Sequence, residues 1–172
     1  MVHSVELTFD PDTETAVRQI WATLAEAGLP SQALHRSPTN RPHATLAVSE
    51  WIDPQVDTGL SATTRLLPLD CRLGAPMLFG RKAFTLVRLV VPSAGLLQLH
   101  ESVDAICAPH MTPGPLAHSR PGQWTPHVTL CMRLAPADVA TAIEVIGVSD
   151  VVGSFAGLRR WDGDARVEHP IS

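Results

Sequence analysis

Two stretches decide the fold: Pro42-His-Ala-Thr-Leu-Ala-Val48 and Pro126-His-Val-Thr-Leu-Cys-Met132 share the pattern Pro-His-x-Thr-Leu. In a β-strand, side chains two residues apart lie on the same face. His43 therefore shares a face with Thr45, and His127 shares a face with Thr129. The intervening apolar residues are expected to point into the core: Ala44, Leu46, Val48, Val128, Leu130 and Met132.

The segments before the two motifs follow the same order. Residues 4–9 alternate between polar and apolar side chains, Asp10 and Pro11 open a helix that ends at Gly28, and a loop spans 29–41. Residues 84–91 predict a strand, Pro92 and Ser93 open a helix to residue 107, and a loop spans 108–123. Pro11 and Pro42 are 31 residues apart, and Pro92 and Pro126 are 34 apart. This near-constant spacing indicates a duplicated unit.

The remaining segments complete an α+β fold. Alternation over 67–73 predicts a strand that turns at Gly80-Arg-Lys82, residues 136–146 predict a short helix, and 148–161 with 165–171 predict a hairpin. We expect a single domain over 1–172, two-lobed, with antiparallel strands and flanking helices around a central cleft. Lobe 1 carries its motif at 42–48, lobe 2 carries its motif at 126–132, and an approximate two-fold axis relates them.

Composition narrows the possible functions. The formal net charge of −4 argues against a protein that coats nucleic acid or an anionic membrane through bulk charge. Three widely spaced cysteines without a C-x-x-C pair argue against a disulfide framework and a thiolate zinc site. The first residues lack the pattern of a signal peptide, and no apolar run is long enough to span a bilayer. We expect a cytoplasmic monomer with no membrane partner.

The repeated residues suit phosphodiester chemistry. Cleaving a phosphodiester needs a base for the attacking oxygen, an acid for the leaving oxygen, and donors for the non-bridging oxygens. Histidine can be neutral or charged near pH 7, so two opposed histidines can supply both the base and the acid. Threonine hydroxyls can hold the phosphoryl oxygens. This reaction requires no metal, and no histidine in the chain has the spacing of metal ligands.

The twin motifs, 84 residues apart, resemble the H-x-[ST]-x motifs of the 2H phosphoesterase superfamily, and within it the bacterial 2′-5′ RNA ligase family. The resemblance covers nearly the whole chain. It implies a metal-independent, cofactor-free phosphodiesterase that acts on 2′,3′-cyclic phosphates or 2′-5′ linkages of RNA ends or small nucleotides. Carried over residue by residue, the catalytic set is His43, Thr45, His127 and Thr129.

The chain departs from this family in two places. Ala47-Val-Ser-Glu50 stands where many members have a Phe-Leu-Gly-like stretch, and Met132 stands where many have arginine, with Arg133 one position later. These departures leave the substrate open.

Three further residues are candidate substrate contacts: Arg41, Trp124 and Arg133. Arg41 lies in the loop before the first motif, where it can bind phosphate or remain a solvated loop charge. Trp124 can stack on a base or be a buried aromatic at the start of a strand.

Two functions of other classes stay open. One is a nucleotide- or RNA-binding module of the same fold without turnover. The other is a structural domain, which would leave the repeated polar pairs without a purpose.

Overall fold

A computed structural model describes residues 1–172 as an α+β fold, as the sequence predicts. The nine strands are β1 (His3–Phe9), β2 (His43–Ser49), β3 (Trp51–Ile52), β4 (Leu69–Gly80), β5 (Phe84–Val90), β6 (Met111–Thr112), β7 (His127–Leu134), β8 (Val151–Asp162) and β9 (Val167–Ile171). The four α-helices are α1 (Pro11–Glu26), α2 (Val56–Ser61), α3 (Ala94–Cys107) and α4 (Val139–Ile146). The short strands β3 and β6 and the helix α2 are not anticipated by the sequence patterns, because each is too short to show a period.

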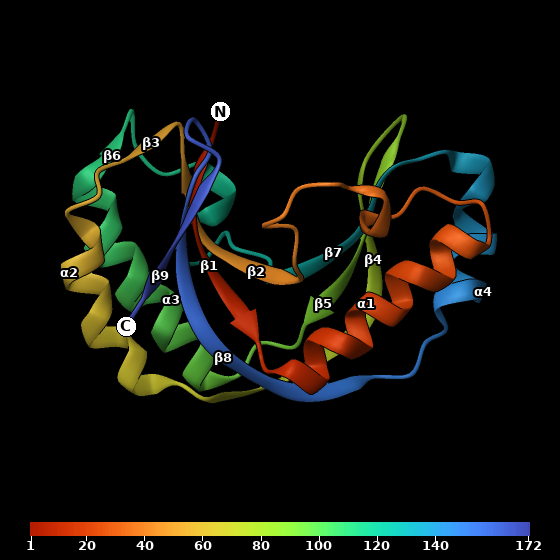
Figure 1. Ribbon diagram of the computed structural model, residues 1–172, viewed down its shortest axis with the longest axis horizontal. Coiled ribbons are helices and arrows are strands. Elements are labelled where there is room, and N and C mark those ends of the chain that lie inside the picture. Colours follow the sequence, from red (N-terminus) through yellow and green to blue (C-terminus); the bar gives the residue numbers. More distant parts are fainter.

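The main sheet is antiparallel, and its order is β2-β1-β8-β4-β5-β7, with β9 paired to β8. An axis between β8 and β4 exchanges the two halves: β2 with β7, β1 with β5, and β8 with β4. This order confirms the predicted duplication and its approximate two-fold axis. The sheet is strongly curved, so the two motif strands β2 and β7, which are its two ends, approach each other (Figure 1).

Each helix of the duplicated unit packs beside the motif strand of the other lobe. Helix α1 follows β1, and besides β1 it contacts β7, β8 and α4; helix α3 follows β5 and contacts β2 and α2 (Figure 1). Asp10 caps α1, as expected, and its carboxylate also accepts from the backbone N–H of Ser154 on β8. A Cβ at Gly153 would lie 1.7 Å from Oγ1 of Thr13, so this close approach of α1 to β8 requires glycine.

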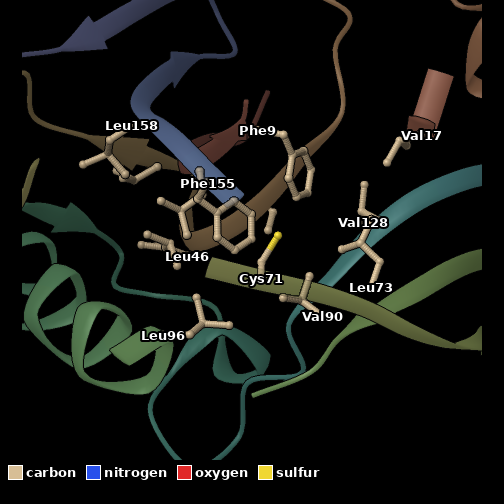
Figure 2. Packing of buried hydrophobic residues seen from close by; sticks show 14 of the residues in the cluster. Phe9, Val17, Leu46, Cys71, Leu73, Val90, Leu96, Val128, Phe155 and Leu158 are labelled. Atoms are coloured by element: carbon tan, nitrogen blue, oxygen red, sulfur yellow. The ribbon is translucent and has the colours of Figure 1, made fainter. Parts of the chain in front are cut away.

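The buried apolar residues form one cluster that draws on both lobes. Figure 2 shows Leu46 of β2, Val128 of β7 and Phe155 of β8 in the same packed interior. The rings of Phe9 and Phe155 stack with centroids 4.8 Å apart. The three cysteines are buried and free, as expected, and burial raises the pKa of Cys107 to about 12.

Each motif strand contains a β-bulge, which changes the side of the sheet to which the residues after it point. Thr45 pairs with Glu6 while Ala47 pairs with Val5, so Leu46 is an extra residue on β2. Leu130 is the extra residue at the equivalent place on β7. The bulges turn Ala47 and Cys131 into the core and carry Val48 and Met132 to the cleft side. The prediction that Met132 points into the core is therefore wrong, because Met132 is 55% exposed. Val48 is buried as predicted, although it lies outside the main apolar cluster and lines the cleft.

Candidate functional site

Three adjoining cavities surround the two His-x-Thr pairs. The first, about 340 Å³, is lined by His43 and Thr45 with polar residues of lobe 1. The second, about 190 Å³, joins His43 to Thr129, and the third, about 670 Å³, joins Thr45 to His127. Two of the cavities therefore contain the histidine of one motif and the threonine of the other. The four side chains predicted from the sequence line one continuous cleft between the lobes.

The two imidazole rings are anchored in the same way. Nδ1 of His43 lies 2.8 Å from the carbonyl oxygen of Arg41, and Nδ1 of His127 lies 2.7 Å from that of Thr125. A carbonyl oxygen can only accept, so Nδ1 carries the hydrogen in both rings. This leaves Nε2 of each histidine to exchange a proton with a ligand, which is the arrangement an acid–base pair needs.

Two tryptophans fix the motif strands from the opposite lobe. Nε1 of Trp21 on α1 donates to the carbonyl oxygen of Thr129 at 3.0 Å, and Nε1 of Trp124 donates to that of Thr45 at 2.9 Å. Both bonds are possible because α1 and the loop before β7 reach across to the other motif strand. The backbone at each threonine is thereby tied to the neighbouring lobe.

The charges around the two histidines differ. A carboxylate oxygen of Glu6 lies 3.7 Å from Nε2 of His43, and Arg159 binds the same carboxylate at 2.7 Å. Burial alone would raise the pKa of Glu6, but the charges of His43 and Arg159 and hydrogen bonds from Ser4 and Arg159 bring it below its ordinary value. Glu6 is therefore ionised at neutral pH.

His127 has no carboxylate beside it. Burial lowers the pKa of His127, and the charges of His43 and His118 act in the same direction, partly offset by the hydrogen bond to Thr125. The ring of Phe79 meets the imidazole edge-on, with centroids 4.9 Å apart. This environment favours the neutral imidazole.

The three candidate substrate contacts have different positions. Arg41 lines the cleft, with its guanidinium held by Glu14 at 2.6 Å. Trp124 also lines the cleft, and one face of its indole stacks on His100 at 3.9 Å. Arg133 lines none of the three cavities; it has a φ of 60° at the second bulge of β7, beyond Met132. The bulges bring Met132, and not Arg133, into the cleft.

Sequence reasoning missed three cleft residues. Glu6 and Arg159 are 153 positions apart, and no local pattern shows that they pair. Phe79 belongs to the predicted strand–turn–strand segment, where an aromatic residue is ordinary. The strand alternation did place Glu6 on the face opposite Val5 and Leu7.

No group of three or more His, Cys, Asp or Glu side chains is arranged to hold a metal ion. None of the helices combines the length and apolar character needed to cross a bilayer.

Comparisons with known proteins agree with this fold. Residues 9–164 match the family model described as the 2′-5′ RNA ligase superfamily. No curated protein matches the sequence significantly. Among solved structures, the protein TT0787 of Thermus thermophilus is 18% identical over 100% of this chain and 96% of that one, with a TM-score of 0.59. LigT of Escherichia coli is 16% identical over 99% and 94%, with a TM-score of 0.55.

A third similar structure is Usb1 of Kluyveromyces marxianus with uridine monophosphate. It is 10% identical over 99% of this chain and 97% of that one, with a TM-score of 0.57. At these identities, the structures support the fold.

Proposed function

The chain belongs to the 2′-5′ RNA ligase superfamily, and from that premise we propose that it is a phosphodiesterase acting on 2′,3′-cyclic phosphates or 2′-5′ linkages of RNA ends or small nucleotides. One observation carries the proposal: both His-x-Thr pairs line one cleft, and both rings hold Nδ1–H on a carbonyl so that Nε2 is free. A single imidazole could not act as base and acid at once on opposite sides of phosphorus.

The four side chains divide the chemistry among them. One imidazole takes the proton of the attacking oxygen, which bonds to phosphorus as the bond to the leaving oxygen breaks. The other imidazole gives its proton to that leaving oxygen. The hydroxyls of Thr45 and Thr129 donate to the non-bridging oxygens, whose charge is concentrated during the displacement. No step requires a metal ion or a cofactor.

The ligands of the structural neighbours support a nucleotide in the cleft. LigT has been crystallised with 3′-AMP, with NADP⁺ and with ATP, and Usb1 with uridine monophosphate. The cavity beside His127 is mainly apolar, formed by Phe79, Trp124 and Met132 among others, which suits a base or a ribose. The cavity beside His43 is polar and suits phosphate and hydroxyl groups.

A substrate panel tests the proposal. Nucleoside 2′,3′-cyclic phosphates, 2′-5′ dinucleotides and oligoribonucleotides with cyclic phosphate ends are each incubated with the protein in excess EDTA, and ³¹P NMR identifies the product. We expect turnover of at least one class, with unchanged rate after chelation. Tight binding without product would favour the non-catalytic module. Activity that EDTA abolishes and a divalent metal restores would contradict the two-histidine mechanism.

A further inference from the structure

The approximate two-fold symmetry breaks at the residue that pairs with each motif threonine. Thr45 on β2 lies opposite Glu6 on β1, whereas Thr129 on β7 lies opposite Val87 on β5. Both partners are buried, with Glu6 5% exposed and Val87 fully covered. Glu6 is also the only acidic residue that lines any of the three cavities of the cleft. The two otherwise matched halves therefore differ by one buried carboxylate.

Two residues, Ser4 and Arg159, hold the Glu6 carboxylate through three contacts. The hydroxyl of Ser4 donates to Oε1 at 2.5 Å, and Nε and Nη2 of Arg159 contact Oε2 at 2.8 and 2.7 Å. Arg159 also binds Glu168 and the carbonyl oxygen of Thr39. Oε1, the oxygen that Arg159 does not contact, lies 3.7 Å from Nε2 of His43. The carboxylate is thus fixed beside the one nitrogen of His43 that can exchange a proton.

The charged groups facing His43 come from several elements. Glu6 lies on β1, Arg159 on β8, and His127 on β7, while the guanidinium of Arg41 is held by Glu14 of α1 and His35 lines the same cavity. The charge of Arg159 is shared between two carboxylates, Glu6 and Glu168. Glu6 is therefore the carboxylate that lies beside Nε2 of His43, at 3.7 Å, and its negative charge opposes a positive charge on that ring.

The surroundings of His127 have the opposite effect. Its neighbours Phe79 and Met132 are apolar, and the nearby titratable groups are His43 and His118, which can carry only positive charge. An imidazole in this position has nothing to balance a proton on Nε2.

From this asymmetry we propose that Glu6 is a positioning residue that balances the positive charge on His43 as the general acid, and that His127 is the general base. The inference rests on the proposed function and gives the reaction a direction. The attacking oxygen loses its proton to Nε2 of His127 and bonds to phosphorus; the opposite P–O bond breaks, and its oxygen takes the proton of His43. The leaving group therefore lies on the side of lobe 1, next to Glu6.

Ring protonation, followed by NMR with ¹⁵N-labelled histidine, tests the assignment without any need for turnover. We expect the ring of His127 to lose its proton at lower pH than the ring of His43. In Glu6→Gln, the ring of His43 should lose its proton about one pH unit earlier, while His127 changes little. Glu168→Gln is the matched control, because it removes the other carboxylate on Arg159 without touching His43; its effect on His43 should be less than half as large.

Two results would overturn the assignment. One is a wild-type protein in which His127 holds its proton to higher pH than His43, and this measurement does not depend on whether Glu6→Gln folds. The other is an equal effect of Glu6→Gln and Glu168→Gln on His43.

The pH–rate profile of the substrate found in the panel provides a second readout. Its limbs belong to the coupled pair, so the ring spectra are needed to assign them. Glu6→Gln should move the high-pH limb about one unit lower and leave the low-pH limb in place. The rate of the variant would then be about tenfold lower than that of the wild type at pH values above the original limb. Movement of the low-pH limb alone would contradict the assignment. Absence of turnover in the wild-type protein would refute the proposed function. The NMR spectra of the histidine rings would still test whether Glu6 affects the protonation of His43.

Discussion

The hydroxyls of Thr45 and Thr129 are the simplest groups of the cleft to test, because each side chain is only partly buried and lies outside the apolar core. Thr45→Ala and Thr129→Ala should each lower kcat by about 10- to 10³-fold, since one donor to the phosphoryl oxygens is lost while proton transfer survives. Steady-state kinetics on the substrate found in the panel measures this. Thr→Ser at either site keeps the hydroxyl and should retain most of the rate; equal losses in Ala and Ser variants would argue against the donor role.

At the scale of single residues, the sequence predicts which side chains carry the chemistry, but it does not predict the residues that surround them. The period-two pattern correctly places His43 and Thr45 together, but it cannot show that Leu46 is a bulge residue. Bulges depend on the partner strand, and β1 lies far from β2 in sequence, beyond α1 and a loop. The same limit hides Glu6, because its burial depends on Arg159 from the far end of the chain.

At the scale of elements, the cap of α1 links that helix to the sheet. Asp10 accepts from the N–H groups of Asp12 and Thr13 and from Ser154 on β8. Hydrogen bonds from Thr13 and Ser154 lower the pKa of Asp10 well below its ordinary value. Asp10→Ala should therefore reduce the free energy of unfolding by about 1–2 kcal/mol at pH 7, measured by urea denaturation.

The pH dependence of this cap has a definite sign. A carboxyl whose folded-state pKa is depressed stabilises the protein above its unfolded pKa, about 3.9, and loses that contribution as pH falls toward the folded value. Asp10→Asn keeps a capping side chain but cannot titrate. The stability difference between wild type and Asp10→Asn should shrink between about pH 5 and pH 2; a difference independent of pH would show that ionisation of Asp10 does not matter.

The indole N–H groups of Trp21 and Trp124 hydrogen-bond the two motif strands, and so hold α1 and the loop before β7 against them. Trp124→Phe removes the N–H bonded to Thr45 but can keep the stack on His100, and Trp21→Phe removes the N–H bonded to Thr129. Each variant leaves a backbone carbonyl without its partner and should lose about 1–3 kcal/mol of stability. A shift of the threonine would also reduce kcat, by up to about 100-fold. Thermal melting and kinetics together check this; unchanged values for both variants would refute the tethering role.

The order of the elements along the chain can be predicted from the sequence. The packing of each helix beside the motif strand of the other lobe cannot. Asp10-Pro11 and Pro92-Ser93 mark the helix starts correctly because capping is a local property. That α1 packs beside β7 and α3 beside β2 depends on the curvature of the whole sheet. Propensity and periodicity carry no information about that long-range packing.

At the scale of the whole molecule, one core joins both lobes. The buried cluster includes Leu46 and Val128 from the two motif strands, Val17 from α1 and Leu96 from α3 (Figure 2). We therefore expect a single cooperative unfolding transition, with the calorimetric enthalpy equal to the van't Hoff enthalpy. Two separate transitions in differential scanning calorimetry would mean that the lobes are independent domains, against the prediction of one domain over 1–172.

The approximate two-fold axis is the whole-molecule feature on which the account depends. It brings two equivalent strands from opposite ends of the sheet to one cleft, so each His-x-Thr pair completes the other. The duplicated order of strand, helix, loop and motif in the sequence predicts this arrangement, because equivalent units in one sheet have few ways to pack. Glu6 and Val87 occupy equivalent positions in the two halves, and the repeated motif does not predict that they differ.

The most direct test of the central claim is kcat for wild type, His43→Ala, His127→Ala and the double variant on the substrate found in the panel. Each single replacement should lower kcat by about 10²–10⁴-fold, and the double replacement should cost less than the product of the two, because the histidines act as a unit. Circular dichroism and melting should be unchanged. Wild-type turnover in either single variant, with the fold intact, would contradict the claim that the two histidines form one acid–base site.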